Sequence, residues 1–254
     1  MSSVNVDVQG RVAVLRLDKP RGNAIDEPFT KDLLEATRTV AADASVHGVL
    51  LASAHPKLFC PGLDLVTLFA YDRPAMARFM GLFSEAVLAL FSLRKPVVAA
   101  LGGHAVAGGC VLALAADHRM LRRGAQIGLN EVRVGLPLPW PVAILLKSSV
   151  APGALSRVAL LGQNLTDDDA RSIGLVHEVL EAEGFEAACL ARAQEFAKQD
   201  HAVVGTTKAY LREAALREMR EREEELRGEF LDAWFSPAGR RRIQETIESL
   251  ARKS

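Results

Sequence analysis

Cysteine is scarce in this chain of 254 residues, which contains only three. Cys60, Cys110 and Cys189 are scattered, and two of them lie beside glycines in expected turns. Their number and spacing exclude a disulfide framework, and neither a C-x-x-C nor an H-E-x-x-H pattern offers ligands to a metal. We therefore expect reduced thiols in a cytoplasmic protein without a bound metal ion.

Net charge is absent as well, because 31 lysines and arginines balance 31 aspartates and glutamates. Such a chain lacks the overall positive charge that attracts nucleic acid or an acidic membrane surface. No run approaches about 18 apolar residues without a charge, and no basic segment followed by an apolar one begins the chain. We expect no nucleic acid and no membrane as a partner.

Nucleotide-binding signatures are also missing. Gly103 and Gly108 have the spacing of a P-loop, but the lysine and the Ser/Thr that should follow are absent. No G-x-G-x-x-G motif follows the first expected strand. The sequence therefore argues against a nucleotide-binding function.

Apolar residues are plentiful, at 49% of the chain, which is enough for a sizeable buried core. Alternating apolar residues predict a β-hairpin over residues 4–17, and helical spacing predicts helices at 28–41 and over most of 66–93. Strands and helices then alternate, which predicts an α/β fold. The chain from residue 184 onward has a helical pattern, with helices expected at 185–198, 202–226, 229–235 and 237–252.

Two strand–glycine turn–helix units stand out. In one, a buried strand at residues 49–52 is followed by a turn at Pro61-Gly62; in the other, the apolar run 96–101 is followed by Gly108-Gly109 and a row of small helix formers. Free backbone N–H groups at such turns, beside the positive end of a helix, favour negative charge. Two of these turns could direct two N–H groups at one oxygen, which is the geometry of an oxyanion hole.

Three motifs together resemble the crotonase (enoyl-CoA hydratase/isomerase) superfamily: F-C-P-G-L-D-L at residues 59–65, A-G-G-C at 107–110 and G-L-N-E at 128–131. They occur in order over nearly the whole chain. The proline- and aromatic-containing loop at residues 136–141 makes the resemblance closest to the mitochondrial-type Δ3,Δ2-enoyl-CoA isomerases.

The resemblance implies a crotonase-type spiral of β-β-α turns. Residues 1–183 would form this core with the coenzyme A and acyl site, and residues 184–254 a helical oligomerisation region. The implied assembly is a homotrimer, or a hexamer made of two trimers. Apolar residues of the last helices would avoid water either in a subunit interface or on the chain's own core; they are Phe230, Leu231, Trp234 and Phe235.

The resemblance also implies the catalytic groups. The backbone N–H groups of Leu63 and Gly108 would hold the thioester oxygen, and losing one such donor typically costs roughly 10²–10³ in rate. Family members that hydrate a double bond use two glutamates, whereas here Val111 matches the first position and Glu131 the second. One carboxylate can still remove a proton from one carbon and return it to another. The expected reaction is therefore movement of a double bond from position 3 to position 2 of an enoyl-CoA.

The implied substrate is an acyl-CoA thioester, with coenzyme A as part of the substrate and no separate cofactor. Arg21 and Lys57 are candidates for its phosphates, and apolar neighbours such as Leu136 and Trp140 would raise the pKa of Glu131. Phe69, Met76 and Phe79 are expected to border the acyl group. The full set of expected substrate-binding residues is Arg21, Ala24, Lys57, Pro61, Leu63, Asp64, Leu65, Gly108, Leu136 and Trp140.

Two other classes stay open: another crotonase-type lyase or hydrolase, such as a decarboxylase or an atypical hydratase, and a non-catalytic acyl-CoA-binding protein. Val111 opposes ordinary hydration by two glutamates, and Glu131 opposes a pure binding role, which needs no base. The chain also departs from the family pattern at Pro61, which replaces a usual small residue, and at residues 102–104, which replace an Asn-Gly pair. His104 has no assigned role.

Overall fold

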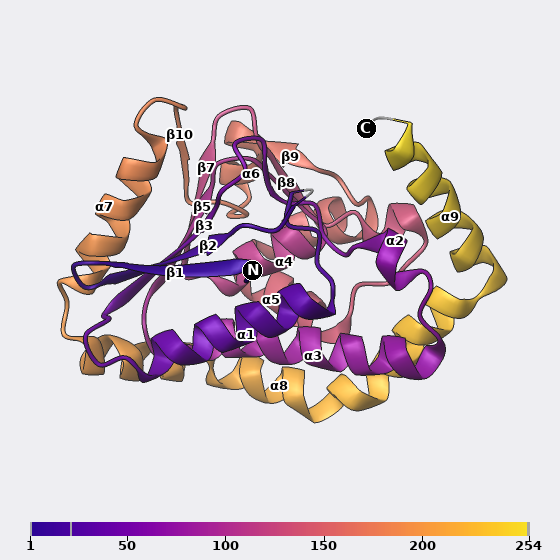
Figure 1. Ribbon diagram of the computed structural model, residues 1–254, viewed down its shortest axis with the longest axis horizontal. Helices are drawn as coiled ribbons and strands as arrows, with labels where there is room; N and C mark the ends of the chain where they lie inside the picture. Colours follow the sequence, from indigo (N-terminus) through magenta and orange to yellow (C-terminus); the bar gives the residue numbers. More distant parts are fainter. Residues whose placement is uncertain (1, 21, 253–254) are drawn as a thin grey trace.

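A strand–strand–helix unit occurs three times along the chain (Figure 1). Each unit contains a longer strand followed by a shorter one. The elements of these units are β3 (Gly48–Ser53), β4 (Leu58–Cys60), α2 (Leu65–Leu68) and α3 (Arg73–Ser92); β5 (Val97–Leu101), β6 (His104–Val106) and α4 (Gly108–Ala115); and β7 (His118–Arg122), β8 (Gln126–Gly128) and α5 (Trp140–Ser149). This repeat, seen in a computed structural model that describes residues 2–20 and 22–252, is the expected β-β-α arrangement.

Successive units stack equivalent strands beside one another. The longer strand of each unit lies in a six-stranded sheet with the order β1-β2-β3-β5-β7-β10, and the short strand of each unit lies in a four-stranded sheet with the order β4-β6-β8-β9. Pairing is parallel except in β1–β2, the expected hairpin, and β8–β9. Parallel strands covered on both faces are mostly apolar, as β5 is throughout and β3 is as far as Ser53. The remaining strands are β1 (Val4–Gln9), β2 (Val12–Leu17), β9 (Leu165–Thr166) and β10 (Glu178–Leu180).

Helices cover both sides of the six-stranded sheet. In Figure 1, α7 lies along one face, while α1, α3 and α8 form a layer on the other side. The side chains of Asp26 and Asp72 cap α1 and α3, and each helix has a proline in its first turn. The further helices are α1 (Glu27–Ala42), η1 (Glu131–Val134), η2 (Pro152–Ala154), η3 (Ser156–Leu160), α6 (Asp167–Ser172), α7 (Phe185–Ala197), α8 (His201–Phe235) and α9 (Pro237–Ala251).

The core has two parts. The larger lies between the sheets and the helical layer and contains Phe59 and Phe79; the smaller lies between the six-stranded sheet and α7. The C-terminal helices add to the larger part, because Phe230, Leu231 and Trp234 are buried against their own chain and Phe235 is partly buried. Of the two expected ways of shielding these residues, packing on the chain's own core is therefore the one observed.

One carboxylate ties α8 to the sheet. Asp117 accepts a hydrogen bond from the Val97 N–H at 2.7 Å, and its carboxylate lies 2.6 Å from Lys208 Nζ and 2.6 Å from Arg212 Nη2. Burial lowers the pKa of Lys208 to about 8, against the opposing effect of Asp117. Removal of Asp117 would leave the buried Lys208 ammonium without this carboxylate partner.

The expected break between helices 202–226 and 229–235 is wrong, because α8 is continuous over His201–Phe235. Gly228 costs a helix only about 1 kcal/mol, and the burial of Phe230 and Trp234 on the next turns outweighs that cost. Conversely, the helical stretch expected over 66–93 is interrupted between α2 and α3, where Asp72 caps a new helix.

By length and composition, α3 is the one helix in the described part of the chain that could cross a membrane. Half of its apolar window is buried inside the protein. Met76, Phe79 and Leu90 on this helix are buried in the larger core, as in a core helix.

Replacing glycine with alanine should have opposite effects on the free energy of unfolding at positions 109 and 228. A Cβ atom at Gly109 would lie 2.0 Å from the Cys60 carbonyl oxygen, so Gly109→Ala must force α4 away from β4. We expect it to lower the free energy of unfolding by about 3 kcal/mol or more. A Cβ atom at Gly228 meets nothing within 4 Å, and Gly228→Ala should raise the free energy of unfolding by about 0.5–1 kcal/mol. Urea denaturation measures both; wild-type stability in Gly109→Ala would contradict the tight contact.

Candidate active site

The first glycine turn follows β4. Gly62 has a φ of +99°, and its carbonyl accepts the Ile25 N–H at 2.8 Å. The Asp64 N–H in turn donates to the Ile25 carbonyl at 2.8 Å. This bridge uses the backbone groups on either side of Leu63, whose own N–H has no hydrogen-bond partner within residues 2–20 and 22–252.

The second turn follows β6. Ala107 has a φ of +49° and a ψ of −120°, a conformation that costs a residue with a side chain about 1–3 kcal/mol. It is held there by its N–H, which donates to the Gly128 carbonyl at 2.8 Å. Gly108 begins α4, so its N–H points out of the helix with no carbonyl of a preceding helical turn to receive it.

The two turns touch each other. A Cβ atom on Gly62 would lie 2.8 Å from Ala107 Cβ and 3.0 Å from the Gly108 nitrogen. A Cβ atom on Gly108 would lie 3.1 Å from Gly62 Cα and 2.9 Å from Ile25 Cδ1. Glycine at both positions therefore lets the backbone segments that carry the Leu63 and Gly108 N–H groups meet.

Glu131 follows β8 and begins η1. Its backbone is fixed by the Leu136 N–H, which donates to the Glu131 carbonyl at 3.0 Å, and by Gly135, whose φ of +79° ends the turn. Its Oε2 atom is buried without a hydrogen-bond partner in the described part of the chain. Burial raises the pKa of this carboxyl group to about 7. The same charge contributes to raising the pKa of the buried Cys110 thiol.

Strand pairing brings the three groups to one edge. The strands β4, β6 and β8 are neighbours, all parallel, and Leu63, Gly108 and Glu131 each follow the carboxyl end of one of them. Ligands of α/β proteins bind beyond the carboxyl ends of such strands. Unpaired N–H groups beside a carboxyl group that titrates near pH 7 can stabilise a developing oxyanion while a proton moves on and off carbon.

Other expected residues fall near this edge with different exposure. Leu136 is buried, whereas Trp140 is partly buried at the start of α5, and its indole N–H donates to the Glu218 carbonyl of α8 at 2.9 Å. Val111 lies on α4 and is 1% exposed. Its apolar side chain occupies the position that matches the first glutamate of the two-glutamate pattern.

Most of the residues expected along coenzyme A lie near the first turn in the sequence. Lys57 and Pro61 are exposed, whereas Ala24, Asp64 and Leu65 are partly buried. The Asp64 side chain caps α2 by accepting the Thr67 N–H at 3.1 Å. The candidate phosphate contact Arg21 lies outside the described residues. Of the residues expected to border the acyl group, Met76 and Phe79 are fully buried in the core and Phe69 is partly buried.

Sequence reasoning assigned no role to three residues that hold the site's loops. Asn23, with a φ of +68°, is buried, and its amide donates to the Phe59 carbonyl at 2.9 Å. Lys19 Nζ lies 2.6 Å from the Ala24 carbonyl oxygen and 3.7 Å from an Asp64 carboxylate oxygen. His104 Nδ1 accepts the Gln126 N–H at 3.0 Å and so joins β6 to β8. The turn-forming Asn23 was the available signal, since asparagine tolerates positive φ.

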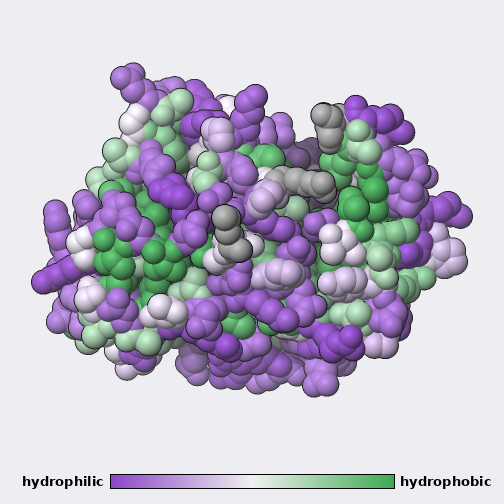
Figure 2. All heavy atoms as spheres, in the orientation of Figure 1, coloured by the Kyte–Doolittle hydropathy of each residue, from purple (hydrophilic) through white to green (hydrophobic). Residues whose placement is uncertain are grey.

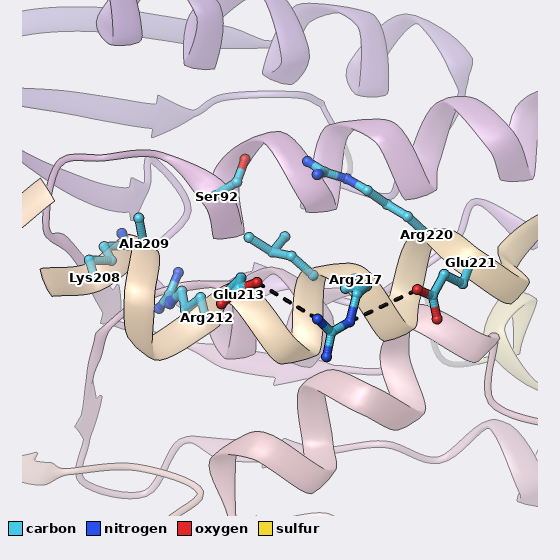
Figure 3. A pocket seen from close by; sticks show the side chains of 9 residues that line it. Ser92, Lys208, Ala209, Arg212, Glu213, Arg217, Arg220 and Glu221 are labelled. Atoms are coloured by element: carbon cyan, nitrogen blue, oxygen red, sulfur yellow. Dashed lines mark ion pairs between the residues drawn. The ribbon is translucent and has the colours of Figure 1, made fainter. Parts of the chain in front are cut away.

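A hollow of about 400 Å³ lies elsewhere, between the end of α3 and α8 (Figure 3). Ser92, Arg212, Leu216 and Arg217 are among the residues that line it. Arg217 forms ion pairs with Glu213 and Glu221. None of the groups at the strand edge belongs to it, so it is separate from the candidate site. Within residues 2–20 and 22–252, no cluster of three or more His, Cys, Asp or Glu side chains could hold a metal ion.

Comparison with known proteins extends the motif resemblance. A sequence profile for enoyl-CoA hydratase/isomerase matches residues 7–249. Human mitochondrial enoyl-CoA delta isomerase 1 is 31% identical over 214 residues, which are 83% of this chain and 70% of that protein. The short-chain-enoyl-CoA hydratase of Clostridium acetobutylicum is 29% identical over 182 residues, 71% of this chain and 70% of that one.

The crystal structure of human mitochondrial delta3-delta2-enoyl-CoA isomerase has a TM-score of 0.94 with this chain at 28% identity, over 99% of both chains. The crotonase-type spiral is thereby confirmed over its whole length. The isomerase and hydratase relatives are similarly distant, so they define the common chemistry rather than one reaction. The chain belongs to the enoyl-CoA hydratase/isomerase family, the crotonases, and is an enzyme that acts on acyl-CoA thioesters.

Proposed function

We propose that this enzyme is a Δ3,Δ2-enoyl-CoA isomerase, which moves a double bond from position 3 to position 2 of an enoyl-CoA thioester. The supporting observation is the contrast between Glu131, a buried carboxyl group at the strand edge, and Val111, an apolar residue at the position of the other glutamate of the two-glutamate pattern. Glu131 Oε2 is buried and, among the described residues, unpartnered, while the buried side chain at position 111 is valine. Hydration by two glutamates therefore lacks one of its groups.

The proposed reaction starts with the thioester oxygen between the N–H groups of Leu63 and Gly108. The Glu131 carboxylate takes a proton from C2, and the electron pair of the broken C–H bond moves into a dienolate whose negative oxygen the two N–H groups stabilise. The electron pair then returns from the oxygen through the dienolate to C4, which takes the proton back from the Glu131 carboxylic acid. The double bond now lies between C2 and C3, and the base is regenerated.

A pKa near 7 suits both halves of this cycle, because the same group must first accept a proton and then donate it. An ordinary glutamate, with a pKa of 4.5, would be a weaker base. Burial is the physical cause of the raised pKa, and it outweighs a hydrogen bond from the residue's own backbone, which lowers the pKa.

We propose that coenzyme A enters only as part of the substrate, without a separate cofactor. Its phosphates would meet Arg21 and the exposed Lys57, and the chain around Ala24, Pro61, Asp64 and Leu65 would flank it. Leu136 and Trp140 would complete the apolar surroundings of Glu131.

The second candidate is an atypical hydratase or another crotonase-type reaction, which the hydratase relatives favour. A panel of 3-enoyl-, 2-enoyl- and malonyl-type CoA thioesters, followed by absorbance and mass, separates the candidates. The isomerase should convert 3-enoyl-CoA and show little hydration of 2-enoyl-CoA. Efficient hydration of 2-enoyl-CoA by the wild type would contradict the proposed isomerase activity and favour an atypical hydratase.

Glu131→Gln removes the base but keeps the shape of the side chain. We expect it to abolish conversion of 3-enoyl-CoA while the affinity for the CoA thioester stays nearly unchanged, as measured by steady-state kinetics and calorimetry. Val111→Ala is the control and should change the turnover far less, because valine has no ionisable group. Near-wild-type turnover in Glu131→Gln would exclude Glu131 as the base.

The same variant should be more stable than the wild type at pH 8. The folded-state pKa of about 7 exceeds the ordinary value of 4.5, so ionisation of Glu131 above pH 7 opposes folding, by up to ~3 kcal/mol. This contribution disappears below pH 4.5, where the group is protonated in both states. Urea denaturation at pH 5 and pH 8 measures the difference.

The rate should follow the ionisation of Glu131. Because the reaction needs the carboxylate, kcat/KM for 3-enoyl-CoA should rise through pH 7 and fall about tenfold per unit below it. A profile flat from pH 5 to pH 8 would contradict a base whose pKa burial has raised.

We also propose a homotrimer, or a hexamer made of two trimers, in the cytoplasm. The three cysteines are unpaired, and Tyr210 and Leu211 on α8 are 77% and 80% exposed in the single chain. Association would cover such apolar side chains. Light scattering should give three or six times the 27.4 kDa chain mass; a stable monomer at micromolar concentration would contradict the assembly.

A further inference from the structure

Arg240 joins the C-terminal helix to α2. It lies in the first turn of α9, and its Nη1 donates to the Phe69 carbonyl at 3.0 Å. Its guanidinium carbon lies 3.4 Å from the centre of the Phe69 ring and 5.9 Å from that of Phe235. No carboxylate pairs with Arg240 in the described chain, so its contacts are with this carbonyl and these rings.

Phe69 ends the helix that begins directly after the first glycine turn. Its N–H donates to the Leu65 carbonyl at 2.9 Å, and it is the C-cap of α2, a helix of one turn. The opposite end is capped by Asp64, the neighbour of Leu63. A single turn has little stability of its own, so a contact that fixes Phe69 also fixes the segment from which the Leu63 N–H projects.

The same C-terminal helix touches the element that carries Glu131. A Cβ atom on Gly135 would lie 2.6 Å from Arg242 Cδ, and Ile243 is fully buried beside it on α9. A hollow of about 490 Å³ remains between Arg133 of η1 and the outer part of α9. Figure 2 shows hydrophobic residues gathered where α9 stands beside α2. The helix thus contacts the segments that follow both the oxyanion turn and the base.

We propose that Arg240 is a positioning residue of the active site: by clamping Phe69 it orients the Leu63 N–H toward the thioester oxygen. It does not touch the reacting atoms and acts through α2. This inference rests on the proposed oxyanion hole, but it does not depend on which crotonase-type reaction that hole serves.

The planarity of the guanidinium is essential to this role. Arginine can stack flat on the Phe69 ring and donate in its own plane at the same time, whereas the lysine ammonium is a compact charge without a face to stack. Lysine at this position would therefore keep the positive charge but could not both stack on the Phe69 ring and donate to the Phe69 carbonyl. Arg241, the next residue on α9, is exposed, and its side chain makes no hydrogen bond or ion pair in the described chain, so it is a matched control for loss of charge.

The test is an infrared measurement of a saturated acyl-CoA labelled with ¹³C at the thioester carbonyl, bound to full-length protein. Two well-placed N–H donors polarise the carbonyl and lower its stretching frequency. We expect a clear shift in the wild type and in Arg241→Met, and a smaller one in Arg240→Met and Arg240→Lys. For conversion of 3-enoyl-CoA, kcat of the Arg240 variants should fall about 10–100-fold with little change in KM.

The pH profile separates positioning from general damage. If Arg240 acts only on the oxyanion turn, the midpoint of the profile stays where Glu131 sets it while the plateau falls. Wild-type polarisation in Arg240→Lys, or in a folded Arg240→Met, overturns the role of Arg240. An unshifted carbonyl band in the wild type instead overturns the oxyanion hole, and with it the proposed function.

Discussion

The contact between the Gly62 turn and the start of α4 is the constraint on which the site depends. Two backbone segments far apart in the sequence approach so closely that a Cβ atom on Gly62 would lie 3.0 Å from the Gly108 nitrogen. At Gly109, a Cβ atom would overlap the Cys60 carbonyl. Only the parallel stacking of β4 and β6, repeated by the spiral, brings these segments together in this register. The two N–H groups are therefore positioned by the fold and not by their own side chains.

The site concentrates energetic costs that the rest of the molecule offsets. Ala107 adopts a strained conformation, and Glu131 buries a carboxylate oxygen without a hydrogen bond from the described residues. The larger part of the core holds the strands and helices next to these residues, and the Asp117 contacts to Lys208 and Arg212 hold α8 against the sheet. Strain and desolvation of this kind are expected where a pKa must be shifted for catalysis.

Much of this arrangement could be predicted from the sequence, because local signals agree with the fold. The glycine turns and the apolar strands report backbone geometry directly, and the motifs around Leu63, Gly108 and Glu131 indicated the family. The continuity of α8 could not be predicted, since the helix runs through Gly228 on the strength of tertiary packing by Trp234. The hydrogen bonds of His104 and Arg240 could not be predicted either, because each joins segments that only the spiral brings together.

Transfer of a label within one substrate molecule tests the single buried base most directly. With 3-enoyl-CoA carrying two deuterium atoms at C2, one deuterium passes to Glu131 and the other stays on carbon. A carboxyl group shielded from water predicts 2-enoyl-CoA that retains much of the transferred deuterium at C4, as measured by mass spectrometry and NMR. Complete replacement of that deuterium by solvent hydrogen, together with accumulation of 3-hydroxyacyl-CoA, would show that water takes part and would contradict isomerisation by Glu131 alone.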